Sequence, residues 1–166
     1  MKRQTTTVRS IETPASAPQY ELRVRYRAAL DPEYEVWQVP ARATPWLRSP
    51  LRLAGLHGRN LELVEHRVHR HLSRAGIRLQ RMRAGEEKRY VLSEQLALTL
   101  GLLFRVLAPM RSRDNMRKVT EGVEAMPQEE AAYWLGMAMH RPNPRRVLTA
   151  LRVLLTDPRR RPELVS

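Results

Sequence analysis

The sequence predicts an α+β protein that is predominantly helical, with an N-terminal β-hairpin, a winged-helix-like middle and a C-terminal helical bundle. Three observations predict this fold class. Apolar and charged residues alternate over Tyr20–Arg27, residues 59–92 have the pattern of a helix followed by a basic hairpin, and apolar residues recur at helical spacing after Ser93. The expected divisions are a flexible arm (1–19), the hairpin with the winged-helix-like region (20–92), the bundle (93–158) and a basic tail (159–166).

The N-terminal hairpin is predicted from two segments joined by a turn. Over Tyr20–Arg27, apolar side chains alternate with glutamate and arginine, which is the period of a half-buried strand. Asp31 and Pro32 are typical of a turn, and Tyr34–Val39 can return as the second strand. The next segment is an irregular connector with prolines at positions 40, 45 and 50, and Leu51–Leu56 is expected to form one short helix.

The winged-helix-like middle is predicted from a capped helix and the hairpin after it. Asn60 is a favourable N-cap, and Gly76 is a plausible residue just past the C-terminus. The helix has an apolar stripe at helical spacing, made of Leu61, Val64, Val68, Leu72 and Ala75. Residues 77–83 and Lys88–Leu92 are expected to form the two strands of the hairpin, with the turn between them.

The remainder of the chain is predicted to be helical. Ser93 caps a long helix that Pro109 stops near Ala108. Further helices are expected to start at Asp114 or Asn115, at Pro127 and at Asn143-Pro144, the last one ending at Asp157-Pro158. The broad apolar stripe of the first of these helices indicates either a buried central helix or a subunit interface.

The composition favours polyanionic partners. The 166 residues carry a formal net charge of +13, and the sequence contains no cysteine. A strongly basic chain attracts DNA or RNA by neutralising phosphates and releasing counterions. Without cysteine there are no disulfides or thiolate metal sites, which is compatible with a reducing cytoplasm, the expected location. The apolar runs are too short to span a bilayer, so no membrane partner is expected.

The basic residues concentrate in the middle of the chain. Between Arg42 and Arg83 there are ten arginines and two acidic residues. Arginines on the helix avoid the apolar stripe, and those of the hairpin can approach the backbone of an adjacent groove. The candidate nucleic-acid-binding residues are Arg59, Asn60, Arg67, Arg70, Arg74, Arg78, Arg81, Arg83, Lys88 and Arg89. The competing interpretation is an ordinary solvated face, or pairing with acidic residues of a partner subunit.

Patterns that would indicate catalysis or a metal are weak. Glu62, His66 and His69 share one helical face, but no further ligands are evident in the sequence. The alternating acids Asp31–Glu35 and the pair Glu86–Glu87 lack a full nuclease pattern of two acids and a lysine. No Gly-rich phosphate loop or nucleophile elbow occurs. We therefore expect no enzyme activity, no metal and no cofactor, with a small metal-dependent nuclease as a remote alternative.

The C-terminal half resembles a known group of proteins. The segments Gly101–Arg105, Ala108–Arg111, Tyr133–Met137 and Pro144–Leu148 look like those of a family of small uncharacterised bacterial proteins associated with antiphage-defence gene clusters. The resemblance covers residues 95–156 and rests on apolar helix motifs of low chemical specificity. It implies a non-catalytic component of a DNA-directed defence complex, and it implies no catalytic residues.

These observations predict a non-catalytic nucleic-acid-binding subunit of a larger complex. The arginines of residues 59–89 would neutralise phosphates, with duplex DNA as the favoured nucleic acid and a larger protein as a further partner. The alternative is a structural subunit that binds a protein through its helical half and does not contact nucleic acid.

Overall fold

A computed structural model describes residues 18–40, 49–140 and 142–157. The predicted arm up to residue 17, part of the proline connector (41–48) and the predicted basic tail lie outside the described residues. The elements in chain order are β1 (Gln19–Ala28), β2 (Asp31–Val39), β3 (Leu51–His57), α1 (Gly58–Arg74), β4 (Glu87–Leu92), α2 (Glu94–Leu107), α3 (Arg113–Glu124), α4 (Gln128–His140) and α5 (Pro144–Thr156).

The four strands form one antiparallel sheet in the order β3-β2-β1-β4. β1 and β2 form the hairpin that the period-two pattern predicts, with Leu22 opposite Val36 and Val24 opposite Tyr34. These four side chains are buried on the inner face, and the residues between them lie on the outer face. The alternation in the sequence therefore gives the sheet an apolar inner face and a charged outer face.

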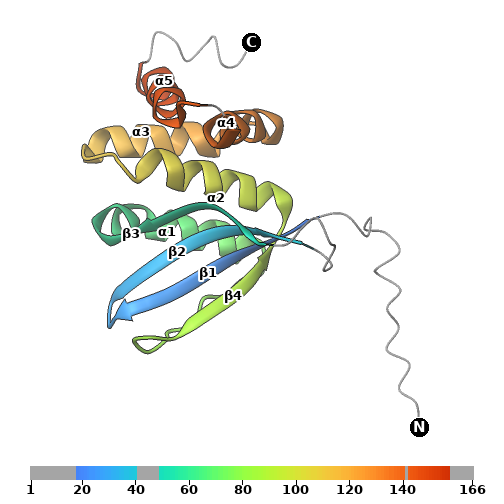
Figure 1. Ribbon diagram of the computed structural model, residues 1–166. Helices are drawn as coiled ribbons and strands as arrows, with labels where there is room; N and C mark the ends of the chain where they lie inside the picture. The colour runs from blue at the N-terminus through green and yellow to red at the C-terminus, as the bar shows by residue number, and fades with distance from the viewer. Residues whose placement is uncertain (1–17, 41–48, 141, 158–166) are drawn as a thin grey trace.

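The helices cover the inner face of the sheet in two layers (Figure 1). α1 and α2 pack against the strands, and α3, α4 and α5 pack on the far side of α2. Nine of the 14 residues of α2 are buried, so its broad apolar stripe is core rather than a subunit interface. The core is continuous from β1 to α5. No helix in the described part of the chain is long and apolar enough to cross a bilayer.

The predicted winged-helix-like middle is wrong. That prediction required residues 77–83 to pair with Lys88–Leu92 as a hairpin. In the structure residues 77–83 form no strand, and β4 pairs with β1, where Tyr90 lies opposite Leu22. The physical reason is that β1 has a second edge with a matching apolar face. The apolar side chains of residues 77–83 pack against the core instead of following the register of a wing.

Leu51–Leu56 is part of strand β3, not the short helix that was predicted. Leu56 lies opposite Tyr34 and Ala54 opposite Val36, so β3 covers the outer edge of β2. A short apolar run does not distinguish helix from strand by period alone, and the pairing with β2 decides it here. The register shifts at Trp37, and Leu53 is buried beside Ala54.

The predicted caps of the C-terminal helices are mostly confirmed. The Ser93 hydroxyl accepts a hydrogen bond from the amide of Leu96 at 3.2 Å at the start of α2. The Asn143 side chain accepts one from the amide of Arg146 at 3.3 Å at the start of α5. α3 begins at Arg113, slightly earlier than predicted, because Ser112 is its N-cap. These local signals position the helices correctly because capping depends only on neighbouring residues.

Asn60 is not the N-cap of α1, which begins at Gly58 after His57. Its Nδ2 atom donates to the carbonyl oxygens of Leu107 at 2.8 Å, Ala108 at 3.2 Å and Met110 at 2.9 Å. Carbonyl groups at the end of a helix lack partners within that helix. Asn60 therefore supplies the missing donor and ties the first turn of α1 to the end of α2.

We predict that Asn60→Ala lowers the free energy of unfolding by about 1–3 kcal/mol, because the carbonyl groups of Ala108 and Met110 lose this donor and that of Leu107 keeps only the Met110 amide. Asn60→Asp is expected to cost more, since its carboxylate would face carbonyl oxygens. Chemical denaturation at neutral pH measures both effects. The control is Asn115→Ala, which changes an exposed asparagine of α3. Equal denaturation midpoints for Asn60→Ala and Asn115→Ala would contradict the assigned role.

Candidate nucleic-acid interface

Three of the predicted binding residues lie together on the exposed side of α1. At 100° per residue, Arg59, Arg70 and Arg74 fall within about 60° of one another, opposite the buried stripe. All three side chains are exposed. Among the described residues no carboxylate lies within ion-pair distance of them, and Arg70 contacts only the His66 ring, at 3.3 Å. This side of α1 therefore presents uncompensated positive charge.

A turn at Gly76 brings further arginines next to α1. Gly76 has φ +78°, a conformation that favours glycine. The amide of Ile77 donates to the carbonyl oxygen of Leu72 at 2.8 Å, and the amide of Gly76 donates to that of Ser73 at 3.0 Å. This pair of bonds is a Schellman motif, which ends a helix and reverses the chain. The predicted glycine terminator of α1 is thus confirmed.

The segment after Gly76 carries three exposed arginines, Arg78, Arg81 and Arg83. None of their side chains has a carboxylate partner in the described part of the chain, although the Arg83 amide donates to Glu86 at 3.1 Å. The segment reaches β1 through the amide of Gly85, which donates to the carbonyl oxygen of Tyr26 at 2.7 Å. Arg78 therefore lies beside the second half of α1, and the segment continues from there to the end of β1, so these arginines are not on a wing.

Arg67 lies apart from the other predicted residues because it faces α3. Its guanidinium forms an ion pair with Glu124 at 2.5 Å and a longer one with Glu121 at 3.4 Å. The His71 ring contacts the other carboxylate oxygen of Glu124 at 2.8 Å. Arg67 therefore joins α1 to α3, and its charge is compensated within the protein.

Lys88 and Arg89 lie on opposite faces of β4. The Lys88 ammonium donates to the side-chain oxygen of Gln80. Arg89 lies on the outer face, where its guanidinium is 3.9 Å from Glu21 and 3.7 Å from Glu87. The structure therefore does not bring either residue together with the arginines of α1.

Two arginines that the sequence analysis did not single out lie beside the start of α1. Arg111 and Arg113 are exposed in and after the turn between α2 and α3, and no carboxylate partner is recorded for either in the described residues. Asn60 holds this turn against α1, and Arg113 lines a cavity of about 400 Å³ with Glu62 and Arg67. The available signal was the pair of arginines around the N-cap Ser112.

We call the eight unpaired arginines on these three segments the arginine band. Its members come from the turn before α3 and the start of α3, from the exposed side of α1 and from the segment after Gly76. Glu62, an exposed acidic residue of α1, lies near the band. The members of the band are Arg59, Arg70, Arg74, Arg78, Arg81, Arg83, Arg111 and Arg113.

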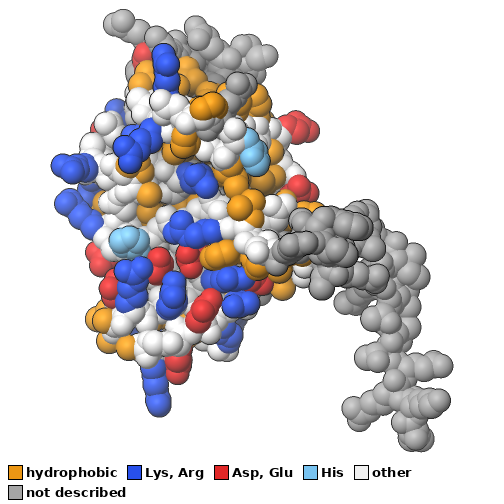
Figure 2. Space-filling view, viewed as in Figure 1, with side chains coloured by type: hydrophobic (Ala, Val, Ile, Leu, Met, Phe, Trp, Pro, Cys, Tyr) orange, Lys and Arg blue, Asp and Glu red, His pale blue; other side chains and the backbone are white. Residues whose placement is uncertain are grey.

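The outer face of the sheet has a different electrostatic character, because its arginines are paired. Figure 2 shows Lys or Arg side chains alternating with Asp or Glu side chains over the strands. Glu33 is buried between Arg27, at 2.8 Å, and Arg25, at 3.7 Å. The Arg23 guanidinium lies 4.1 Å from the centre of the Trp37 ring, a cation–π distance. This face is close to neutral and is a poor surface for a polyanion.

The alternative metal and nuclease sites find little support in the geometry. His69 contacts the Tyr34 hydroxyl and Glu65, whereas His66 contacts Arg70. The two histidines therefore have different neighbours and do not form one site. Glu33 and Glu35 on β2 form ion pairs with Arg27 and Arg52. No group of three potential metal ligands occurs in the described part of the chain.

Tyr34, Glu65 and His69 form a hydrogen-bonded network between β2 and α1. The Tyr34 hydroxyl donates to Glu65 at 3.0 Å and lies 2.9 Å from Nε2 of His69. Because the hydroxyl has one hydrogen, its oxygen accepts a hydrogen bond from His69. Burial, together with the neighbouring Glu65 carboxylate, raises the pKa of the Tyr34 hydroxyl far above its ordinary range. The network therefore keeps Tyr34 neutral and fixes the His69 ring.

Comparison with known proteins identifies a family but no function. Residues 20–157 match the model of a family described as a domain of unknown function (DUF7680), so the chain belongs to that family. The match spans both the sheet and the helices. No curated protein and no solved structure matches the chain. The family contributes no known activity, so a function has to be inferred from the surface described above.

We predict that Tyr34→Phe changes the dependence of stability on alkaline pH. In the unfolded chain tyrosine ionises near pH 10, whereas folded Tyr34 stays protonated, so it reduces stability by about 1.4 kcal/mol per pH unit above that value. Tyr34→Phe lacks this contribution. Denaturation between pH 8 and about pH 11.5 should therefore show the wild type losing stability relative to the variant.

The control for this experiment is Tyr133→Phe, because Tyr133 is 59% exposed on α4. Its profile is expected to run parallel to that of the wild type. A stability difference between the wild type and Tyr34→Phe that stays constant with pH would contradict the role given to Tyr34.

Proposed function

We propose that this member of the DUF7680 family is a non-catalytic nucleic-acid-binding subunit that holds the phosphate backbone of duplex DNA. The observation that carries the proposal is the arginine band. Its guanidinium groups lack carboxylate partners among the described residues, whereas the arginines of the sheet are paired. Guanidinium groups left to solvent along one side of a helix are suited to bidentate contacts with phosphate oxygens.

The dimensions of the arginine band fit a duplex. α1 has 17 residues and is about 25 Å long, the axial length of about seven base pairs. Residues 58–74, 77–83 and 109–113, which carry the band, include no Phe, Tyr or Trp, so these segments offer little platform for the base stacking on which single-strand binders depend. Without a wing beside α1, the proposed contacts are to phosphates rather than to base edges, and little sequence preference is expected.

The proposed setting is a larger DNA-directed assembly. The resemblance of residues 95–156 to proteins of antiphage-defence gene clusters supports this setting, and it stays a prediction because the matched family has no assigned function. The helical layer is on the opposite side of α2 from the sheet, which leaves it accessible to a protein partner while α1 faces nucleic acid.

The proposal predicts the effect of replacing the arginines of α1. The triple variant Arg59→Gln, Arg70→Gln and Arg74→Gln should bind duplex DNA more weakly at every salt concentration. If each arginine contacts one phosphate, the slope of log affinity against log salt should fall in magnitude by about 2.7. Titrations of a labelled duplex at several salt concentrations measure this slope.

The matched control removes the same charge from the outer face of the sheet, through Arg25→Gln, Arg27→Gln and Arg89→Gln. These arginines are about half exposed but paired with glutamates, so the slope is expected to stay close to that of the wild type. Equal losses in both triple variants would mean that net charge alone governs binding. Absence of binding by the wild type at low salt would overturn the proposal.

A second candidate function is protein binding through α4 and α5. A cavity of about 600 Å³ there is lined mainly by apolar side chains, including Trp134, Met137 and Val147. Tyr133 at its edge is 59% exposed and packs edge-on against Trp134, with ring centres 5.6 Å apart. Exposed aromatic residues beside a cavity are typical anchors of protein interfaces.

The two candidate functions are distinguished by one pair of variants. If the protein-binding function holds, Tyr133→Asp should abolish a stoichiometric complex purified from the native host, while the α1 triple variant retains it. The protein-binding candidate is rejected if the chain purifies alone, or if Tyr133→Asp leaves such a complex intact.

A further inference from the structure

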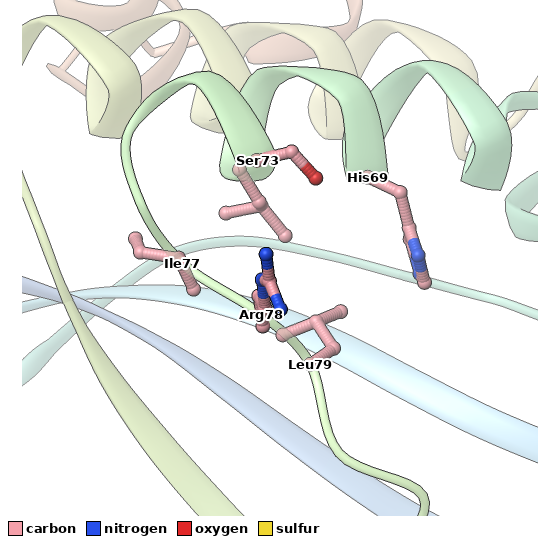
Figure 3. Close-up of a pocket in the computed structure, with 6 residues that line it drawn as sticks. His69, Ser73, Ile77, Arg78 and Leu79 are labelled. Atoms are coloured by element: carbon pink, nitrogen blue, oxygen red, sulfur yellow. The ribbon is translucent and has the colours of Figure 1, made fainter.

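A cavity lies between the second half of α1 and the segment that returns beneath it. Its volume is about 310 Å³, and it is lined by His69, Leu72, Ser73, Ile77, Arg78 and Leu79. Figure 3 shows His69 and Ser73 descending from α1, with Arg78 and Leu79 opposite them on the returning segment. The Schellman motif at Gly76 creates this arrangement, because it reverses the chain within three residues of Ser73.

The polar side chains of the cavity are suited to an anion. Arg78 has no carboxylate partner among the described residues, and Ser73 offers an exposed hydroxyl beside it. The His69 ring is oriented by its bond from Nε2 to Tyr34, whose hydroxyl is committed to Glu65. Because Nε2 carries the hydrogen of this bond, Nδ1 of the neutral His69 ring is an acceptor, which suits a hydroxyl group of a ligand rather than a phosphate oxygen.

The rest of the lining is aliphatic, and the cavity is larger than a phosphate group alone would fill. Leu72, Ile77 and Leu79 form the apolar part, and Leu72 is buried at 1% exposure. A volume of about 310 Å³ is at the lower end of the range of roughly 300–1,000 Å³ for small-molecule sites. These properties fit a ligand of one phosphate joined to a small, partly apolar body.

We propose that the cavity binds a single terminal nucleotide, with its phosphate between Arg78 and Ser73, a sugar hydroxyl donating to His69, and its sugar and base against Leu72, Ile77 and Leu79. This inference deepens the proposed function and rests on it for the class of ligand. Arg78 belongs both to the arginine band and to the lining of the cavity, so a strand end bound by the band has a phosphate contact in common with the cavity. A nucleotide at a strand end reaches the cavity without the loss of pairing that an internal nucleotide requires.

The described lining contains no Phe, Tyr or Trp, and the His69 ring is held against Tyr34, which limits what the cavity distinguishes. Because the base contacts mainly aliphatic side chains, little preference among the four bases is expected. Recognition depends mainly on the phosphate and on the size of the attached group.

The probes for the test are adenosine monophosphate and inorganic phosphate, titrated into the full chain at constant ionic strength. Adenosine monophosphate is expected to bind saturably in the millimolar range, about tenfold more tightly than inorganic phosphate. Arg78→Gln should weaken nucleotide binding by about tenfold, the effect of losing one charge-assisted contact. Arg83→Gln is the matched control, because Arg83 is exposed on the same segment but does not line the cavity.

Two further variants test the geometry. Ser73→Ala and His69→Gln should each weaken nucleotide binding severalfold, and circular dichroism confirms that the variants are folded. Equal affinity for the two probes, or equal losses for Arg78→Gln and Arg83→Gln, would overturn the proposal, as would the absence of saturable binding.

The failure of this inference is distinguishable from failure of the proposed function. If duplex DNA binds with a steep salt dependence but adenosine monophosphate does not bind, the cavity proposal fails and the arginine band remains supported. If the nucleotide binds and duplex DNA does not, the cavity is supported as a nucleotide site and phosphate-backbone binding by the band is rejected.

Discussion

The burial of α2 is the constraint on which the rest of the structure depends. This helix has no fully polar face, so it requires cover from the sheet and α1 on one side and from the C-terminal helices on the other. Gly101 lets α4 and β3 pack closely against α2, because a Cβ atom there would lie 3.3 Å from Leu135 of α4 and 3.8 Å from Leu53 of β3. Once α2 is enclosed, α1 is fixed at its side by Asn60, and the exposed side of α1 becomes a surface of the protein.

The distribution of carboxylates decides which basic surface remains available. Glutamates on β1 and β2 neutralise the arginines of the outer sheet face, and Glu124 of α3 neutralises Arg67. On the exposed side of α1, Glu62 is the nearby carboxylate among the described residues, and no ion pair joins it to an arginine of the band. Among the described residues, unpaired positive charge is therefore concentrated in the arginine band. Surface ion pairs contribute little to stability. Their main consequence here is electrostatic, because they neutralise the outer face of the sheet while the arginines of the band have no such partners.

Local signals in the sequence predicted the elements better than their pairing. The alternation around Leu22, the cap at Ser93 and the glycine after α1 depend on near neighbours, and each of these predictions is confirmed. The pairing of β4 with β1 joins residues about seventy positions apart, for which the local pattern has no signal. The same limit applies to the site: Arg67 avoids the apolar stripe as Arg70 does, and only the position of α3 distinguishes their roles.

The correction of the fold changes the mechanism of the proposed function. A wing after α1 would have placed residues 77–83 away from the helix and would have left α1 free to enter a groove. Instead the chain turns at Gly76 and returns beneath α1, so Arg78 faces Ser73 and His69 across a cavity. Positive charge on a helix backed by the sheet favours contact along the phosphate backbone over insertion between base edges. Discrimination between ligands of different size then depends on the cavity, where the buried Tyr34 hydroxyl orients the His69 ring.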